Sequence, residues 1–537
     1  MNRVNMLESL SDNIIVDKDK CTSCGICVDT CILDNLRLQL SPCRQACPLG
    51  VNCQGYVQLV ARGEEAKALE LLRETLPFPG ILGRICSQPC EDSCHHKNTD
   101  GKSVAIRALK RYLADEFDSN PAIPEIAPDT DRSVAVIGSG PAGLMAAYDL
   151  RKRGHAVTVY ESESEPGGML RWAIPEFRLP TAVVEREIDQ LRQMGVSFHL
   201  ETAIGRDLEM NAVKASHQAV IVATGCPRHL QLENSGKSNA AILHGLPFLK
   251  SIRCGQRPAV GRRVVVIGGG NVAVDAAQTL LRLGAEQVTM VCVEAEHEVP
   301  AHPDAMAQAQ AEGIQLECSW GSVEFLTQDG KLNGVVFQRC VQVFDEQNCF
   351  CPQFDSCELN QIDCDMVIVA IGQIADQQAL DQMGLAADIT AEVDPLTLQT
   401  SDPMVFMAGD VLSGASSVIE AMAKGRQAAE SAHRYLSKEH LRHGRVYAGP
   451  FETGFEIHTD HGNGAERAPI SHSAFSGAGD FDEIEQCFDR ETSRREAGRC
   501  YNCGVPFGKY RTCWFCLPCE VECPHEAMRV EIPYLLR

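Results

Sequence analysis

The chain reads VAVIGSGPAGLMAA at residues 134–147 and VVVIGGGNVAVDAA at residues 264–277. In each stretch a short valine-rich run leads into a glycine-rich turn, and a segment with helical character follows. This order is typical of a dinucleotide-binding unit, in which the amides at the start of the helix face a pyrophosphate. The two stretches therefore predict two nucleotide sites.

The first stretch carries glycine where the dinucleotide fold needs a tight turn, close approach of the backbone to phosphate, and close packing of helix on strand. We expect this turn to be formed by Gly138, Gly140, Pro141, Ala142 and Gly143. A strand at 156–160 then ends at Glu161, whose carboxylate can accept both ribose hydroxyls of an adenosine. With strand, glycines, helix, strand and acid in register, the sequence favours a ligand site over a glycine-rich turn without one.

The second stretch has the same frame, and a strand at 287–293 follows it. We expect its turn to be formed by Gly268, Gly270, Asn271 and Ala273. Glu294 comes where a nicotinamide enzyme selects its cofactor, because a carboxylate bonds a free 2'-hydroxyl and repels a 2'-phosphate. The next residues, AEHEVP, offer no arginine for a phosphate, so the sequence favours NADH over NADPH.

Three further segments indicate that one nucleotide domain is inserted in the other. VIVATG at 220–225 and VIVAIG at 367–372 look like the strands that carry the chain between the domains. VFMAGD at 405–410 resembles a flavoprotein strand whose Gly409 and Asp410 reach the ribityl and phosphate side of FAD. The sequence thus predicts an α/β fold with two Rossmann-like domains, the arrangement of two-dinucleotide flavoprotein reductases. We expect an FAD domain at 131–225 and 373–436, and an NAD(P)H domain at 226–372.

Cysteine spacing marks both ends of the chain, which holds 26 cysteines in all. CxxCxxCxxxC runs, typical of bacterial 4Fe-4S ferredoxins, occur at Cys21, Cys24, Cys27 and Cys31, and again at Cys513, Cys516, Cys519 and Cys523. Zinc also takes four thiolates but usually from two separated CxxC pairs, so the compact runs favour iron–sulfur cubes. The two ends, 1–40 and 481–537, either meet as one split ferredoxin or form separate single-cluster segments.

Charge and composition narrow the class of protein. A net charge of −23 disfavours nucleic acid and anionic lipid surfaces, which need a basic footprint. The start, MNRVNMLESLSDN, lacks the pattern of a signal peptide, and no run of eighteen apolar residues occurs. These features predict a cytoplasmic protein without a membrane partner, in which the grouped cysteines are metal thiolates and not disulfides.

Residues 40–436 resemble the small subunit of glutamate synthase and the flavin and NAD(P)H half of dihydropyrimidine dehydrogenase. The resemblance rests on CRQACP (43–48), GRICSQPCEDSC (83–94), VAIRALKRYLAD (104–115) and GGMLRWAIPEFRLP (167–180), besides the two glycine turns. It implies a module that oxidises NAD(P)H at FAD, or runs in reverse, and exchanges electrons with a separate catalytic unit through 4Fe-4S clusters. It also implies that the loop with Gly168 passes the isoalloxazine.

The same resemblance implies a helical iron–sulfur domain at 41–118. Its implied ligands are Cys43, Cys47, Cys86, Cys90 and Cys94. The usual CxxC ahead of Cys43 is absent, and the family's non-cysteine fourth ligand aligns with Lys110, whose charged form cannot bind iron. The resemblance implies Cys47, Cys86 and Cys90 as ligands of the cluster near FAD, and Cys43, Cys94 or Cys53 can complete that cluster. Cys500 and Cys503 form an isolated CxxC, for which zinc, a further cluster or no metal all stay open.

The remaining features carry less chemistry. Cysteines between 226 and 364 show no ligand spacing and are expected to be structural. The segment after Glu161, SESEPGGMLRWAIPEFRLP, has no cysteine, and the second nucleotide domain has no CxxC, so disulfide reduction beside a flavin is disfavoured. We expect linkers at 118–131 and 447–480, and helices at 56–74 and 104–117.

The sequence therefore predicts an iron–sulfur flavoprotein oxidoreductase subunit with FAD, NAD(H) and three or four 4Fe-4S clusters. Hydride passes between nicotinamide and flavin, and single electrons pass to or from a catalytic partner subunit or a ferredoxin, within a hetero-oligomer. Two alternatives stay open. One is an NADPH-dependent glutamate synthase small subunit, against which the ferredoxin-like ends and Glu294 stand. The other is a non-catalytic relay or assembly adaptor, against which the intact glycines and acids stand.

Overall fold

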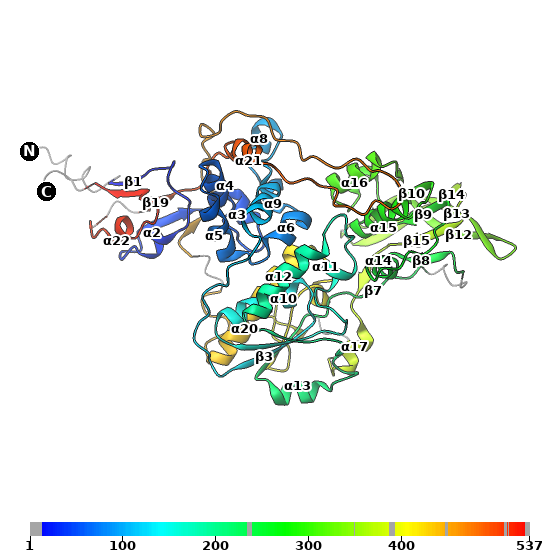
Figure 1. Ribbon diagram of the computed structural model, residues 1–537, viewed down its shortest axis with the longest axis horizontal. Helices are drawn as coiled ribbons and strands as arrows, with labels where there is room; N and C mark the ends of the chain where they lie inside the picture. Colours follow the sequence, from blue (N-terminus) through cyan, green and yellow to red (C-terminus); the bar gives the residue numbers. More distant parts are fainter. Residues whose placement is uncertain are drawn as a thin grey trace, which may run out of the picture.

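The computed structural model describes residues 13–232, 239–347, 349–385, 392–445, 449–509, 513 and 515–531. It confirms the α/β fold with two nucleotide domains. Figure 1 shows the domain that the sequence predicts to bind FAD, called the flavin-type domain, below the centre. The domain predicted to bind NAD(P)H, called the nicotinamide-type domain, lies in green at one end, a small unit lies at the other end, and a blue helical domain lies between these two ends. Among the described helices, none is long and apolar enough to span a bilayer.

The first nucleotide domain is built on a parallel five-stranded sheet in the order β17-β6-β3-β4-β5. The strands are β3 (Ser133–Ile137), β4 (Ala156–Tyr160), β5 (Ser197–His199), β6 (Ala219–Val222) and β17 (Val405–Met407). The helices are α10 (Pro141–Lys152), α11 (Met169–Trp172), α12 (Thr181–Gln193), α13 (Met210–Ser216), α17 (Gln377–Gln382), α19 (Asp410–Ser413) and α20 (Val418–Ser437). Helices α10 and α20 touch at Gly425, where a Cβ would lie 2.1 Å from the Ala142 carbonyl oxygen, so only glycine permits this packing.

The second nucleotide domain has a parallel sheet in the order β11-β10-β9-β15-β8. The strands are β8 (Ile242–His244), β9 (Arg263–Ile267), β10 (Gln287–Val291), β11 (Gln315–Glu317) and β15 (Met366–Val369). The helices are α14 (Gly245–Arg253), α15 (Asn271–Arg282), the short η2 (Glu296–Glu298) and α16 (Pro303–Ala311). An antiparallel sheet of β12 (Trp320–Gln328), β13 (Lys331–Phe344) and β14 (Phe350–Ile362) lies between β11 and β15 in the sequence.

The chain crosses between the two domains twice, side by side. Strand β7 (Arg228–His229) leaves the first domain and pairs antiparallel with β16 (Gln373–Ile374), which returns to it. The nicotinamide-type domain is therefore inserted in the flavin-type domain, because β17 joins the sheet that β3 and β6 began.

The N-terminal helical domain contains α3 (Pro42–Ala46), α4 (Cys53–Ala61), α5 (Glu65–Thr75), α6 (Pro79–Ile85), α7 (Pro89–Asp92), α8 (Lys97–Asp100) and α9 (Ile106–Phe117). The prediction of one helix at 56–74 is wrong. Gly63 adopts φ +76°, a conformation that ends helices, so the segment forms α4 and α5. Helix α21 (Arg490–Ala497) packs against α4 and α9, so this part of the predicted ferredoxin-like tail belongs to the helical domain.

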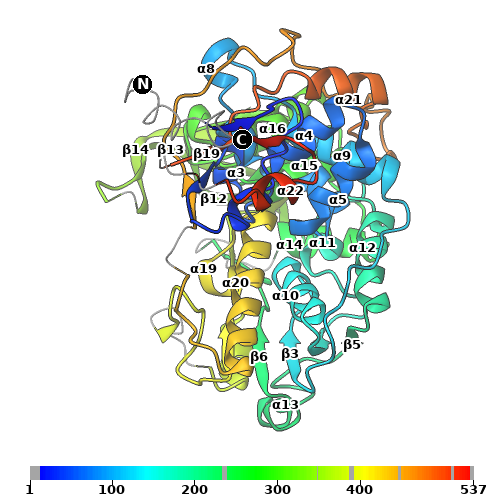
Figure 2. The same cartoon turned by 90° about the vertical axis from the view of Figure 1, so that its left-hand side faces the viewer.

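The two ends of the chain form one small unit. Strand β1 (Ile14–Val16) pairs antiparallel with β20 (Met528–Val530), and α2 (Ile26–Asp29) packs against α22 (Pro518–Val521). Strand β2 (Leu36–Gln39) lies between β18 (Phe451–Glu452) and β19 (Pro506–Gly508). Figure 2 looks onto this end, where red C-terminal elements lie among blue N-terminal ones.

The predicted linker at 447–480 and the residues after it form a strap across the molecule, which we define as residues 466–489. On the nicotinamide-type domain, the Gly479 amide donates to the Arg282 carbonyl (2.7 Å), and the Arg282 guanidinium lies 4.9 Å from the Phe475 ring centre. On the helical domain, Glu483 pairs with Arg84 (2.7 Å) and Glu485 with Arg107 (2.6 Å). The strap thus ties these two domains together. Residues 118–131, by contrast, contain no helix or strand.

Candidate functional site

One cavity of about 1660 Å³ joins the two glycine turns. Single-ligand pockets usually span about 300–1,000 Å³, so this space suits two dinucleotides that meet end to end. Its lining includes most of the predicted nucleotide-binding residues, namely Gly138, Gly140, Pro141, Ala142, Glu161, Gly168, Gly268, Gly270, Asn271, Glu294, Gly409 and Asp410. Gly143 and Ala273 do not line it, because they lie buried where each helix packs on its sheet.

The turn between β3 and α10 has the shape that a pyrophosphate needs. Gly138 has φ +102°, and a Cβ there would lie 2.4 Å from the Ala223 carbonyl oxygen. A Cβ on Gly143 would lie 1.9 Å from the Gly138 carbonyl oxygen, so helix and turn touch directly. A Cβ on Gly140 would meet nothing within 4 Å. The backbone is therefore packed tightly behind the turn and open in front of it, where the α10 amides point.

Glu161 fixes the far side of this turn. Its carboxylate accepts the Ser139 amide (3.0 Å) and the Glu163 amide (2.9 Å). Ser139 Oγ in turn accepts the Gly167 amide (3.0 Å), which holds the loop with Gly168 against the turn. Glu161 thus lies at the end of β4, as an acid that receives ribose hydroxyls must, and organises the loop that lines the flavin side of the cavity.

Gly409 and Asp410 close the cavity from β17. A Cβ on Gly409 would lie 2.7 Å from Ala142 Cβ, so this strand end packs on the start of α10. Burial raises the pKa of Asp410, and Ser416 Oγ donates to its carboxylate (2.6 Å). The backbone of this segment therefore lies beside the first turn, in reach of the same ligand.

The second turn repeats the geometry of the first. Gly268 has φ +138°, and Gly270 precedes α15 with open space in front of it. Asn271 Oδ1 accepts the His302 amide (3.0 Å), which ties the turn to the segment before α16. The Glu294 carboxylate lies over the turn, since a Cβ on Gly269 would be 3.1 Å from Glu294 Oε2. This acid therefore lies beside the second glycine turn, at the wall of the cavity.

The helical domain contributes a cysteine to the wall of this cavity. Cys86 lines the cavity, together with Arg84 and Gln88. The thiols of Cys47, Cys86 and Cys90, together with that of Cys53, lie close enough to the Lys110 ammonium to act on it electrostatically. We call Cys47, Cys86 and Cys90 the proximal set.

The isolated CxxC finds its partners in the helical domain. Cys500 and Cys503 line one small cavity with Cys43 and Cys94, and Cys53 also reaches it. We call Cys43, Cys94, Cys500 and Cys503 the medial set. A CxxC from the C-terminal part of the chain thus lies beside Cys43 and Cys94, although none stands ahead of Cys43 in the sequence.

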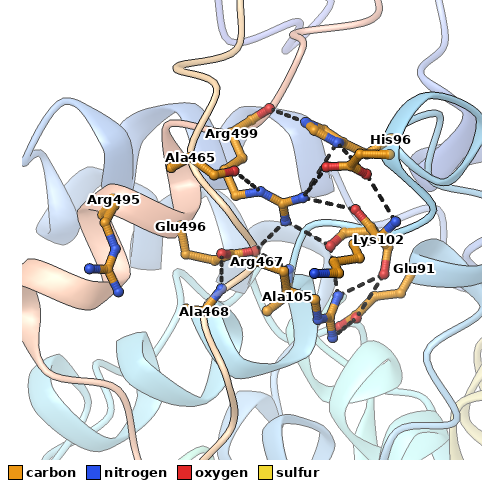
Figure 3. Close-up of polar contacts among 12 residues, drawn as sticks. Glu91, His96, Lys102, Ala105, Ala465, Arg467, Ala468, Arg495, Glu496 and Arg499 are labelled. Carbon is orange, nitrogen blue, oxygen red and sulfur yellow. Dashed lines mark hydrogen bonds and ion pairs between the residues drawn. The ribbon is translucent and has the colours of Figure 1, made fainter.

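A buried ion pair holds the CxxC segment in place (Figure 3). Arg499 is fully buried, donates to the Ser103 carbonyl (2.9 Å) and pairs with Glu496 (2.9 Å) and Asp100 (3.0 Å). The Glu496 carboxylate also accepts the amides of Ala105 (2.9 Å) and Ala468 (2.7 Å). No motif in the sequence marks Arg499 or Glu496, although burial of such charges requires partners of this kind.

The terminal runs exchange their fourth cysteines. One cavity is lined by Cys21, Cys24, Cys27 and Cys523, which we call the inner ferredoxin set. A second is lined by Cys31, Cys513, Cys516 and Cys519, which we call the outer ferredoxin set. This exchange is the ligand pattern of two-cluster ferredoxins. Of the two arrangements left open by the spacing, the structure has the split ferredoxin.

The chemistry of these sets fits cuboidal clusters. Burial raises the pKa of Cys500 to about 12 and that of Cys519 to about 11, so the free thiols stay protonated until a metal displaces the proton. Among the described residues, no three or more His, Cys, Asp or Glu side chains are grouped to hold a single metal ion. A cube with irons at separate corners takes more widely spaced thiolates than one zinc ion, whose sulfurs lie at about 2.3 Å from the metal.

Two family models match this chain. Residues 132–425 match the pyridine nucleotide-disulphide oxidoreductase model, and residues 5–122 match the model described as dihydropyrimidine dehydrogenase domain II, 4Fe-4S cluster.

Curated relatives extend over most of the chain. The NADP(+)-dependent formate dehydrogenase subunit beta of Moorella thermoacetica is 32% identical, over 86% of this chain and 70% of that one. The NADPH-Fe(3+) oxidoreductase subunit beta of Geobacter sulfurreducens is 30% identical, over 86% and 75%. The NAD-dependent dihydropyrimidine dehydrogenase subunit PreT of Escherichia coli O157:H7 is 32% identical, over 74% and 91%. The chain therefore belongs to the family of iron–sulfur flavoprotein oxidoreductase subunits that also includes glutamate synthase small chains.

Proposed function

We propose that this chain is an electron-transfer subunit that moves electrons between NADH and a partner protein through FAD and four 4Fe-4S clusters. One observation carries the proposal: four cysteine sets follow one another from the wall of the nucleotide cavity to the far end of the molecule. The partner is a catalytic subunit or a ferredoxin that docks at the ferredoxin end.

Short links connect each set to the next. Cys53 lies against both Cys90 of the proximal set and Cys43 of the medial set. The Gln54 side-chain amide donates to Ser23 Oγ (3.0 Å), beside Cys24 of the inner ferredoxin set, and to the Gly504 carbonyl (2.6 Å), beside Cys503. Cys27, in α2, belongs to the inner ferredoxin set, and Cys31, just after α2, belongs to the outer set. Residues of successive sets therefore lie next to one another along this route.

The residues of the cavity bind and orient, and hydride transfer requires no side-chain acid or base. When bound, FAD supplies the exchange between paired electrons of hydride and single electrons of clusters. The turn at Gly138–Gly140 and the acid Glu161 would hold its pyrophosphate and ribose, while Gly168 and Asp410 line the flavin side. The second turn and Glu294 would hold NADH with its nicotinamide toward that flavin.

Replacing Glu294 by alanine is expected to shift cofactor preference toward NADPH. The change removes the acceptor for the 2'-hydroxyl and the charge that repels a 2'-phosphate, so kcat/KM for NADPH relative to NADH should rise by about ten- to one-hundredfold. Steady-state reduction of an artificial acceptor with each nucleotide measures this ratio. Glu296→Ala, which removes an exposed acid two residues on, is the matched control. Preference for NADPH in the unmodified chain would contradict the assignment.

Anaerobic purification tests the whole proposal. The chain should hold one FAD and, for four clusters, about sixteen iron atoms. NADH should bleach the flavin absorbance and then give the EPR signals of reduced clusters. A chain that binds no flavin, or holds zinc in place of iron, would refute the function.

A further inference from the structure

The proximal set supplies only three cysteines, whereas a cubane with four protein-bound irons needs four ligands. Two side chains of the described residues stand beside this set as candidates for the fourth place, Cys53 and Lys110. The sequence alone left Cys43, Cys94 and Cys53 as possible thiol ligands here. The structure commits Cys43 and Cys94 to the medial set, together with the CxxC pair.

Among the thiols that the structure describes, Cys53 is the one that lies between the two sets. It is only 3% exposed, and its side chain lies against Cys90 as well as Cys43. It is also the first residue of α4, with Asn52 as the N-cap whose side chain accepts the Gly55 amide. Because the medial set already has four cysteines, Cys53 is free to serve the proximal one.

Lys110 has the opposite character. It is 6% exposed on α9, and among the residues that the structure describes no carboxylate pairs with it and no hydrogen bond to its ammonium is found. An ammonium group has three donors and no acceptor lone pair, so it cannot ligate iron. A buried unpaired cation is costly, and a cluster with four thiolates carries a net negative charge that would compensate it.

We propose that Cys53 binds the fourth iron of the proximal cluster and that Lys110 is a buried cation beside that cluster which favours its reduced form. This inference rests on the proposed function, since it requires that the proximal set holds a 4Fe-4S cluster. It assigns the fourth ligand to α4, so the proximal cluster would have four thiolate ligands, and one of them, Cys53, lies against Cys43 of the medial set.

The test uses the anaerobically purified full chain and its Cys53→Ala variant. Without a fourth ligand, one-electron oxidation by ferricyanide releases Fe²⁺ from one corner and leaves a three-iron cluster, which has its own EPR signal. C53A should therefore lose about one iron per chain and show that signal, with FAD content unchanged. Cys364→Ala, which removes a fully buried thiol of the nicotinamide-type domain, should behave as the unmodified chain. C53S keeps the side-chain size, and a three-iron signal or an altered four-iron signal there supports the assignment equally.

Lys110→Met separates the two candidates. K110M should keep all its iron under ferricyanide, while an EPR-monitored redox titration should show one cluster with a more negative potential, because a neighbouring positive charge is gone. A three-iron signal in K110M but not in C53A would overturn the inference, as would wild-type behaviour of C53A and C53S. A wild-type chain without clusters would instead contradict the proposed function itself, so the two failures are distinguishable.

Discussion

Replacing both Cys500 and Cys503 by serine is expected to remove one whole cluster, about four iron atoms per chain, while FAD stays bound and reducible by NADH. The two cysteines are half the ligands of the medial set, and the two that remain, Cys43 and Cys94, cannot hold a cube. Because the medial set lies between the proximal and the inner ferredoxin sets, reduction of the ferredoxin clusters by NADH should be nearly abolished.

Two readings of one sample measure this effect. Stopped-flow absorbance follows flavin bleaching by NADH, and freeze-quenched EPR follows the appearance of reduced ferredoxin clusters. The matched control is Cys349→Ser with Cys351→Ser, a pair of exposed cysteines beside the β13–β14 turn that belong to none of the four sets. If the double variant at 500 and 503 kept its full iron content, or still reduced the ferredoxin clusters at the normal rate, the serial route would be wrong.

The parts of this molecule that could be predicted from sequence are those whose geometry is local. The glycine turns at 138–143 and 268–273 are each determined by a few consecutive residues, because the φ values and close contacts at Gly138 and Gly268 require glycine there. The acids that come after β4 and β10, Glu161 and Glu294, could be predicted from the same local pattern. The fold class followed from these signals and from the returning strand at 405–410.

Grouping of the cysteines could not be predicted, because it depends on where distant segments meet. Nothing near Cys500 names Cys43 or Cys94 as its partner, and spacing alone allowed zinc or no metal. The sequence did contain one clue to this grouping. The family site lacks one CxxC pair in its usual place, and the chain has one unassigned CxxC elsewhere. The contacts of the strap could not be predicted for a similar reason. They are made by Phe475, Glu483 and Glu485 with domains that are far away in the sequence.

Replacing Arg499 by methionine is expected to detach the CxxC segment from the helical domain. The change leaves the Glu496 carboxylate fully buried without its cation, and breaking a buried pair in this way typically costs about 3–5 kcal/mol. The loss should fall on the local unit that includes α21 and not on the whole chain, which is multidomain and does not unfold in one step. We therefore expect faster loss of the medial cluster on mild urea treatment, and proteolytic cleavage between the strap and Cys500 at lower urea.

Arg495 provides the control, because it is an exposed arginine of α21, the helix that ends just before Arg499, and its side chain lies away from the network in Figure 3. Arg495→Met should change stability by less than about 0.5 kcal/mol, the usual range for surface substitutions. The double variant R499M with Glu496→Gln removes the orphaned charge but keeps an acceptor oxygen for only one of the Ala105 and Ala468 amides, because these donate to different oxygens of Glu496, so it should recover only part of the loss. If R499M held its medial cluster as firmly as R495M, the buried pair would not be what fixes Cys500 and Cys503 beside Cys43. If instead the double variant were no better than R499M, the lost contacts to the Ser103 carbonyl, and not the stranded carboxylate, would account for the damage.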